Sequence, residues 1–202
     1  MKKLLLFTLM LLASSGIQAK FYKATLNFTD GTSRTGYAEA PAPDDNKIKF
    51  RTDEKGKPET IESALLSSLT LAYDKGGSQT FLYLYPAQEK KKGVDKEKNR
   101  KWFGSVYMGK INFVAFESNG HIATGFPGMH YYIHIPGNDY ALYFNTKHAG
   151  ATKVMGEKKL YRRLVEWHFK DICPELVNKF TSEEYETKDM DELIEFYKKT
   201  CE

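Results

Sequence analysis

The chain has 202 residues and a formal net charge of +4 at pH 7, from 30 lysines and arginines against 26 aspartates and glutamates. Lys2 and Lys3 account for two of those positive charges, so the rest of the chain carries +2 (+4 − 2). This weak basicity does not favour a nucleic-acid partner. The length suits one domain, or one domain with an appendage, that can bury a real core.

Residues 1–19 have the three parts of a secretory signal peptide. Lys2 and Lys3 form a basic start, an apolar run covers residues 4–12, and small residues lead to Ala19, after which we expect cleavage. The apolar run is shorter than the roughly 20 residues that span a bilayer. No cysteine lies near the expected cleavage site, so we do not expect a lipid anchor. We therefore expect a soluble mature chain that is secreted or periplasmic, or held at the outer cell surface, with no transmembrane segment.

Residues 20–150 carry the pattern of short β-strands separated by turns. Residues 21–28 alternate in polarity and end at Asp30-Gly31, which favours a hairpin. The clearest hairpin joins residues 68–73 to residues 80–85 across a Gly-Gly turn. Six to nine short strands at this spacing predict an antiparallel sheet that is strongly curved or barrel-like.

Residues 88–101 form a charged insertion with seven basic and three acidic side chains. One interpretation is a basic contact patch for an acidic surface such as phospholipid or polysaccharide. The other is a solvated, partly mobile loop, and the lack of aromatic side chains for stacking favours this second interpretation.

Residues 151–202 change to helical spacing and predict a helical segment packed on the β-rich domain. Apolar and aromatic side chains recur at three- and four-residue steps in a first helix, at Leu160, Leu164, Val165, His168, Phe169 and Ile172. Pro174 opens a second helix, since proline is tolerated in a first turn. A third begins near Asp189, with one apolar stripe at Met190, Leu193, Ile194, Tyr197 and Cys201. The predicted fold class is α+β.

Cys173 and Cys201 are the two cysteines of the chain. In an exported protein an even number of cysteines predicts a disulfide, and two separate buried thiols are the alternative. Neither a CxxC spacing nor a neighbouring histidine pair accompanies them, so we expect a structural role and no metal.

The sequence around Cys173 resembles that of an uncharacterised group of exported Bacteroidetes proteins. These have a β-rich N-terminal half and a helical tail of the form "DCPEL…I…Y…DL…IV.FYN..C". Here "DICPEL" inserts Ile172 between the acidic residue and the cysteine, and Lys198 replaces a common Asn. The resemblance covers residues 157–201 and is faint before them, where "LNFTDGTSRTGYAEA" is similar to the opening strands. It implies export and paired cysteines, and supplies no activity.

The most distinctive stretch outside the predicted core is residues 120–144, which crowd aromatic side chains around glycines and prolines. Its candidate ligand surface consists of Phe126, His130, Tyr131, Tyr132, His134, Tyr140 and Tyr143. The alternative is that half of these rings belong to the core face of the sheet and the rest to its edge. On a strand, the two histidines share a face but lie roughly 13 Å apart, too far to bind one metal. We expect them on an exposed face, and His168 in the core or at an interface.

Sequence motifs for catalysis are missing: there is no GxSxG elbow and no GxGxxG, and Ile111 replaces the Ser or Thr of a phosphate-binding loop. We predict no catalytic residue, no cofactor and no enzyme. The first hypothesis is a non-enzymatic binding or interaction protein of the bacterial envelope, whose partner is a protein, glycan or lipid. The alternative is a carrier of an apolar small molecule inside a barrel. A hydrolase with a dispersed site comes third.

Overall fold

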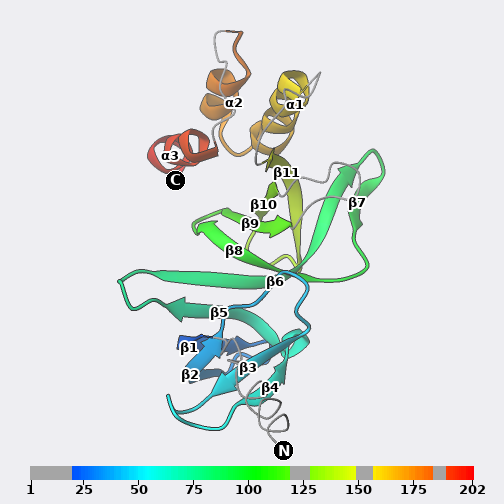
Figure 1. The fold of residues 1–202 in the computed structure, drawn as a ribbon. Coiled ribbons are helices and arrows are strands. Elements are labelled where there is room, and N and C mark those ends of the chain that lie inside the picture. Colours follow the sequence, from blue (N-terminus) through cyan, green and yellow to red (C-terminus); the bar gives the residue numbers. More distant parts are fainter. Residues whose placement is uncertain (1–19, 119–127, 149–156, 184–189) are drawn as a thin grey trace, which may run out of the picture.

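The computed structural model describes residues 20–118, 128–148, 157–183 and 190–202 (Figure 1). Within them, eleven strands precede three helices, which confirms the predicted α+β class with a barrel-like sheet. The predicted signal peptide, Phe126 and the expected boundary at residue 150 lie outside the described residues.

The elements follow one another in chain order. The first strands are β1 (Phe21–Phe28), β2 (Ser33–Glu39), β3 (Lys47–Arg51), β4 (Glu59–Glu62) and β5 (Leu66–Ala72), with a short 3-10 turn at Ser63–Leu65. The next are β6 (Ser78–Lys90), β7 (Gly93–Lys96), β8 (Lys101–Tyr107), β9 (Asn112–Ser118), β10 (Gly128–His134) and β11 (Tyr140–His148). The helices are α1 (Glu157–Phe169), α2 (Pro174–Thr181) and α3 (Met190–Thr200).

Strand β6 is shared by the two halves of the sheet. On one side the order is β6-β5-β1-β2-β3-β4, and on the other it is β6-β8-β9-β10-β11. Strand β11 then pairs in parallel with β6, with Tyr140 opposite Tyr85, and closes the second half into a five-stranded barrel. Closure leaves these five strands without a free edge along the paired segments.

Alternating side chains of β6 are buried in two different cores. Leu82 and Leu84 point into the barrel, while Phe81 and Tyr83 pack against the core of the N-terminal strands. Successive side chains of a strand point to opposite faces, so one strand can serve both cores. The barrel interior is filled by Leu82, Leu84, Phe103, Val114, Tyr132 and Ala141.

The three helices cover the outer face of the barrel (Figure 1). The ring of Phe113 on β9 stacks on Phe169 of α1 at 6.0 Å and meets Tyr197 of α3 at 5.5 Å. This contact joins the first and last helices to the same strand. None of the described helices is long and apolar enough to cross a membrane.

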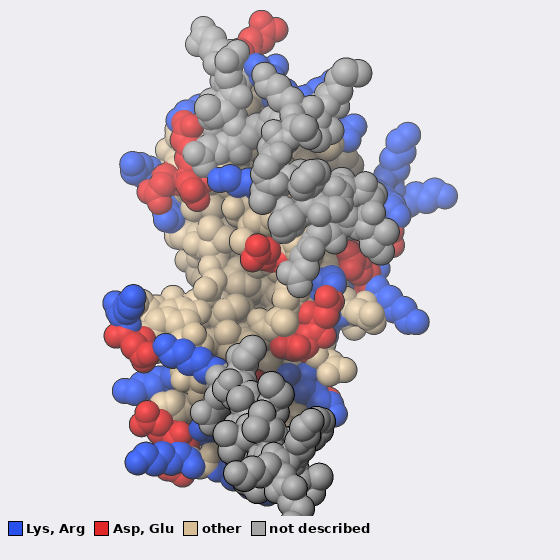
Figure 2. All heavy atoms as spheres, viewed as in Figure 1, with Lys and Arg blue, Asp and Glu red and all other residues tan. Residues whose placement is uncertain are grey.

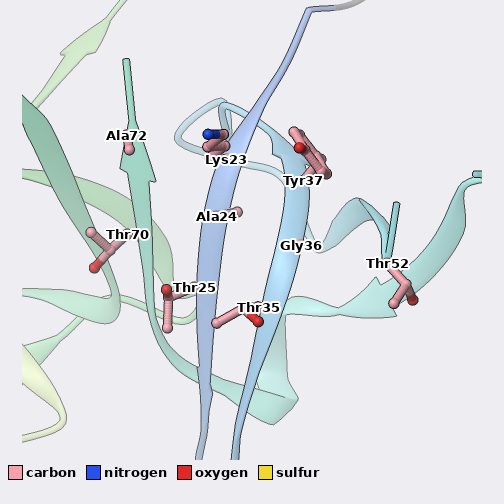
Figure 3. A pocket seen from close by; sticks show the side chains of 9 residues that line it. All are labelled: Lys23, Ala24, Thr25, Thr35, Gly36, Tyr37, Thr52, Thr70 and Ala72. Carbon is pink, nitrogen blue, oxygen red and sulfur yellow. The ribbon is translucent and has the colours of Figure 1, made fainter. Parts of the chain in front are cut away.

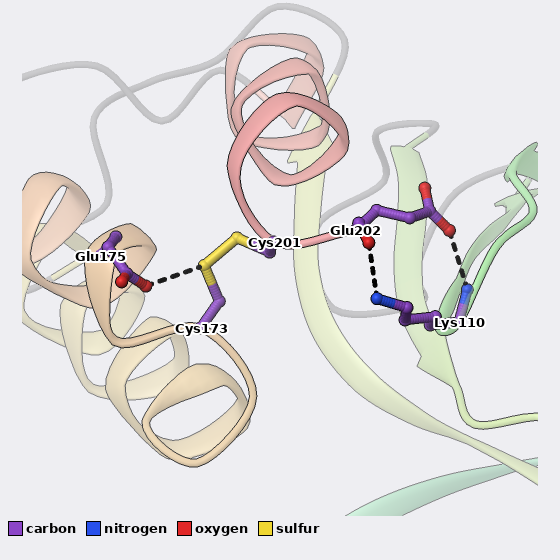
Figure 4. The surroundings of a disulfide bond; sticks show 5 residues. All are labelled: Lys110, Cys173, Glu175, Cys201 and Glu202. Atoms are coloured by element: carbon purple, nitrogen blue, oxygen red, sulfur yellow. Dashed lines mark hydrogen bonds between the residues drawn. A yellow bond between two sulfur atoms is a disulfide. The ribbon is translucent and has the colours of Figure 1, made fainter.

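Cys173 and Cys201 form the predicted disulfide, with their Cα atoms 5.5 Å apart (Figure 4). Cys173 immediately precedes α2, and Pro174 occupies the first turn of that helix, as predicted. The neighbouring Glu202 accepts a hydrogen bond from the backbone N–H of Lys110 at 2.9 Å, and its backbone carbonyl accepts one from Lys110 Nζ at 2.5 Å. The C-terminal residues are therefore fixed both to the helices and to the β8–β9 turn.

The charged segment folds as a β-hairpin and not as the predicted loop. The end of β6 continues past the barrel and pairs with β7, from Ala87 opposite Lys96 to Lys90 opposite Gly93; we call residues 87–96 the arm. Gly93 has a φ of +121°, a conformation that glycine adopts readily and that lets the chain reverse. Lys and Arg side chains project on this side of the molecule, next to β7 (Figure 2).

Candidate functional site

The predicted ligand surface is not continuous among the residues that the structure describes. Tyr131 packs towards the helices, whereas Tyr132 is buried inside the barrel, where burial raises the pKa of its phenol. Tyr140 lies at the base of the arm, with Lys96 Nζ 4.9 Å from its ring centre. Strand alternation separates the neighbouring tyrosines, because consecutive residues of β10 face opposite sides of the sheet.

His134 is 7% exposed, so its predicted position on an exposed face is wrong. Asn112 Nδ2 donates to His134 Nδ1 at 3.0 Å, and the Nε2–H of the same ring donates to the carbonyl of Asn138 at 3.0 Å. Asn112 Oδ1 in turn accepts from the Gly109 N–H at 3.1 Å. With both ring nitrogens engaged, His134 holds together the turns at this end of the barrel and is a structural residue.

His130 belongs to a chain of polar side chains at the opposite end of the barrel. Ser118 Oγ is hydrogen-bonded to His130 Nε2 at 2.8 Å, and Thr146 Oγ1 to His130 Nδ1 at 2.9 Å. Tyr143 continues the chain through its hydroxyl, 2.9 Å from Thr146 Oγ1. Since β11 runs parallel to β6, this is the end of the barrel from which the arm extends.

A cleft separates the arm from α1 at this end of the barrel. It has a volume of about 230 Å³, and we call it the arm–helix cleft. Its lining consists of Gln88, Glu89, Tyr143, Leu160, Arg163, Leu164, Trp167 and His168. Helical spacing places the leucines and the tryptophan on one side of α1, so the helix supplies an apolar wall and the arm a polar one.

His168 lies at the interface between α1 and the barrel, one of its two predicted positions. Its Nε2–H donates to the carbonyl of Tyr143 at 3.3 Å, and its ring meets Phe144 edge-on at 5.7 Å. Burial lowers the pKa of this imidazole more than the nearby Glu89 carboxylate raises it. At neutral pH the cleft therefore contains a neutral histidine.

Two more open concavities lie elsewhere on the sheet. Thr25, Thr35 and Thr70 come from neighbouring strands and line one of about 380 Å³ (Figure 3). The hydroxyls of Thr70 and Thr80 share a hydrogen bond at 3.0 Å, so part of this hydroxyl surface is satisfied within the sheet. The other, about 490 Å³, lies where the two halves of the sheet meet, between residues 41–43 and β8. The arm–helix cleft differs from both in combining an apolar wall with both signs of charge.

The buried His134 and the partly buried His168 predict that stability falls in mild acid. Burial lowers the pKa of both His134 and His168, so between about pH 6.5 and their folded pKa the unfolded chain binds more protons than the folded one. The free energy of unfolding should fall as the pH drops below about 6.5, by at most about 1.4 kcal/mol per pH unit for each group. Urea unfolding at pH 7.5 and pH 5.0 measures this. His168→Gln should reduce the difference, and an unchanged difference would exclude His168 as a source.

Comparison with known proteins gives no relative: no protein-family model, curated protein or solved structure matches the chain. The resemblance of residues 157–201 to exported Bacteroidetes proteins therefore stays a prediction. Within the described residues, no three His, Cys, Asp or Glu side chains are grouped closely enough to hold a metal ion.

The cleft residues were hidden in the sequence for two reasons. Leu160 and Leu164 belong to the predicted apolar side of α1, which is expected to pack on the sheet, although Leu160 is 43% exposed. The many charged side chains of the arm are typical of a solvated loop, so the sequence does not indicate that Glu89 pairs with Val94 in a hairpin. Trp167 is the residue whose position in the sequence could have indicated the cleft. A large aromatic side chain beside the predicted apolar stripe is exposed unless another surface covers it.

Proposed function

We propose that the protein is an exported, non-enzymatic binding protein of the bacterial envelope and that the arm–helix cleft holds its ligand. Export is supported by the signal-like residues 1–19 and by the disulfide, a bond typical of oxidising compartments. One observation supports the site: exposed apolar side chains of α1 face a charged, hydrogen-bonding strand across a cleft.

The exposed apolar wall supports binding over a purely structural role. Leu160 and Trp167 are 43% and 40% exposed, although both line a concave surface. Ligand sites are concave and mostly apolar, with a few polar groups that fix orientation. A ligand that covered these two side chains would remove apolar surface from water, a gain of roughly 25 cal/mol per Å².

The filled barrel supports a surface site over the carrier hypothesis. Phe103 and Val114 are fully buried in the interior, and the Phe103 ring meets the Tyr132 ring edge-on at 4.9 Å. Side chains packed at this density occupy the space that an apolar cargo would need. A ligand can enter the exposed cleft outside the barrel without displacing these side chains.

A hydrolase is the second candidate, because Ser118 Oγ lies 2.8 Å from His130 Nε2. A histidine in this position can accept the proton of a serine nucleophile, and Thr146 fixes the other ring nitrogen. An activated serine should react with a fluorophosphonate probe, and Ser118→Ala should abolish the labelling. Absence of labelling in the wild-type protein eliminates this candidate.

The binding proposal is tested by native mass spectrometry of protein purified from its own envelope. Leu160→Ala should reduce the fraction of protein that carries a bound species at least threefold, since that side chain is part of the apolar wall. Ile172→Ala is the matched control, because Ile172 is 40% exposed but does not line the cleft. Equal occupancy in the two variants would contradict the proposal. The mass of the bound species distinguishes a small molecule from a partner protein.

A further inference from the structure

We infer that the arm–helix cleft takes a zwitterionic ligand with an apolar body: a free amino acid, or a short peptide with free termini. The ammonium group meets Glu89 and the carboxylate meets Arg163. This inference rests on the proposed function, which places the ligand in this cleft.

Opposite charges reach the cleft from its two walls. Glu89 comes from the arm and Arg163 from α1, and both line the same concavity. Within the described part of the chain, neither side chain forms an ion pair or a hydrogen bond, and they do not pair with each other. The neighbouring arm charges behave differently, since Lys90 pairs with Asp95 and Lys96 with Asp139. Glu89 is thus the one carboxylate of the arm that has no cationic partner among the described residues, and it is available to a ligand.

The pair of charges selects against ligands with one sign of charge. A ligand with only a negative charge is attracted by Arg163 and repelled by Glu89. A ligand with only a positive charge is attracted by Glu89 and repelled by Arg163. His168 adds no charge, because its lowered pKa keeps the ring neutral at pH 7. A ligand that carries both an ammonium and a carboxylate group satisfies both walls at once.

The rest of the lining suits an apolar side chain that extends away from the charged groups of the ligand. Leu160, Leu164 and Trp167 form the α1 wall, and Tyr143 of β11 adds an aromatic ring to the lining. Aliphatic and indole surfaces bind a branched aliphatic side chain by excluding water from it. The planar guanidinium of Arg163 can hold a carboxylate through two parallel N–H donors.

Isothermal titration of the purified protein with four probes tests the inference. L-leucine represents the free amino acid and trileucine the peptide, so their relative affinities distinguish the two sources. N-acetyl-L-leucine lacks the ammonium charge and L-leucinamide lacks the carboxylate. Each derivative should bind roughly three- to tenfold more weakly than L-leucine, the range expected for one partly exposed charged hydrogen bond.

Variants assign each ligand charge to its wall. With Glu89→Gln, L-leucine and N-acetyl-L-leucine should bind alike, because the partner of the ammonium group is gone. With Arg163→Gln, L-leucine and L-leucinamide should bind alike. Glu166→Gln and Lys91→Gln remove exposed charges of α1 and of the arm that do not line this cleft, and should leave all affinities unchanged.

Two outcomes overturn the inference and leave the proposed function to its own test. The first is that both charge-deficient derivatives bind as tightly as L-leucine. The second is that neither L-leucine nor trileucine binds while Leu160→Ala still loses the species bound in the envelope. If Leu160→Ala and Ile172→Ala retain that species equally, the proposed function fails as well.

Discussion

Replacing Trp102 with alanine is expected to lower the free energy of unfolding by about 4 kcal/mol, near the middle of the range for large aromatic core residues. Trp102 stands near the start of β8, a barrel strand, but its side chain is 1% exposed and packs in the core of the N-terminal strands. Its indole N–H donates to the carbonyl of Asp45 at 3.0 Å and to Ser63 Oγ at 3.1 Å. Loss of this side chain would create a cavity and remove one donor from the Asp45 carbonyl and from Ser63 Oγ, which would keep only their mutual hydrogen bond at 2.9 Å.

Urea unfolding measures this loss, and the other tryptophan is the control. Trp167 is 40% exposed, and Trp167→Ala should change stability by less than about 1 kcal/mol. Trp102→Phe keeps an aromatic ring but removes the donor, and should fall between the two at about 2 kcal/mol. A loss below about 1 kcal/mol for Trp102→Ala would contradict the conclusion that this side chain stabilises the core of the N-terminal strands.

Removing the disulfide is expected to destabilise the protein by about 3.5 kcal/mol on the chain-entropy scale, because the bond closes a 28-residue loop. The bond links the junction of α1 and α2 to the end of α3. In Cys173→Ser/Cys201→Ser we expect faster amide exchange in α2 and α3, while exchange in β1 and β5 stays as in the wild type. Those strands bury their side chains in a separate core.

Mass measurement after thiol alkylation provides the chemical check. The native protein should take up no alkylating groups before reduction and two afterwards, one for each cysteine. Free thiols in the unreduced protein, or a double serine variant as stable as the wild type, would contradict this account.

The parts of the fold that depend on local sequence were predictable. The Asp30-Gly31 hairpin is present, and Gly31 has the positive φ of +86° that such a turn requires. The three helices and the proline that opens α2 also follow from spacing within short segments. The hairpin, the helices and the proline are encoded by residues that are close in the chain, whereas the disulfide follows from the presence of two cysteines in a chain predicted to be exported.

The barrel closure was predicted only in general terms, because it depends on contacts between distant segments. Strand β6 pairs in parallel with β11, and no local pattern identifies Tyr85 as the partner of Tyr140. The burial of His134 has the same origin: its partner Asn112 comes from another strand, and the pair replaces the water that an exposed histidine would have kept. Polar residues that satisfy each other across strands look exposed in a sequence and are buried in the fold.

The candidate site was harder to predict than the fold. Of the predicted surface residues that the structure describes, Tyr143 alone lines the arm–helix cleft. The other walls come from the arm, which was predicted to be a solvated loop, and from α1, which was predicted to be an amphipathic helix packed on the β-rich domain. A concave site between two such segments depends on how each of them packs on the barrel. The sequence pattern carries no information on the relative orientation of the arm and α1.

The central claim is that ligand binds between the arm and α1, and an NMR titration of isotope-labelled protein with L-leucine tests it most directly. The account predicts saturable shifts of the Trp167 indole N–H and of the Gln88 and Glu89 amides, which line the cleft. The Trp102 indole N–H, buried in the N-terminal core, should not move. No saturable shift at Trp167, or shifts confined to the threonine-lined face around Thr25 and Thr70, would contradict the claim.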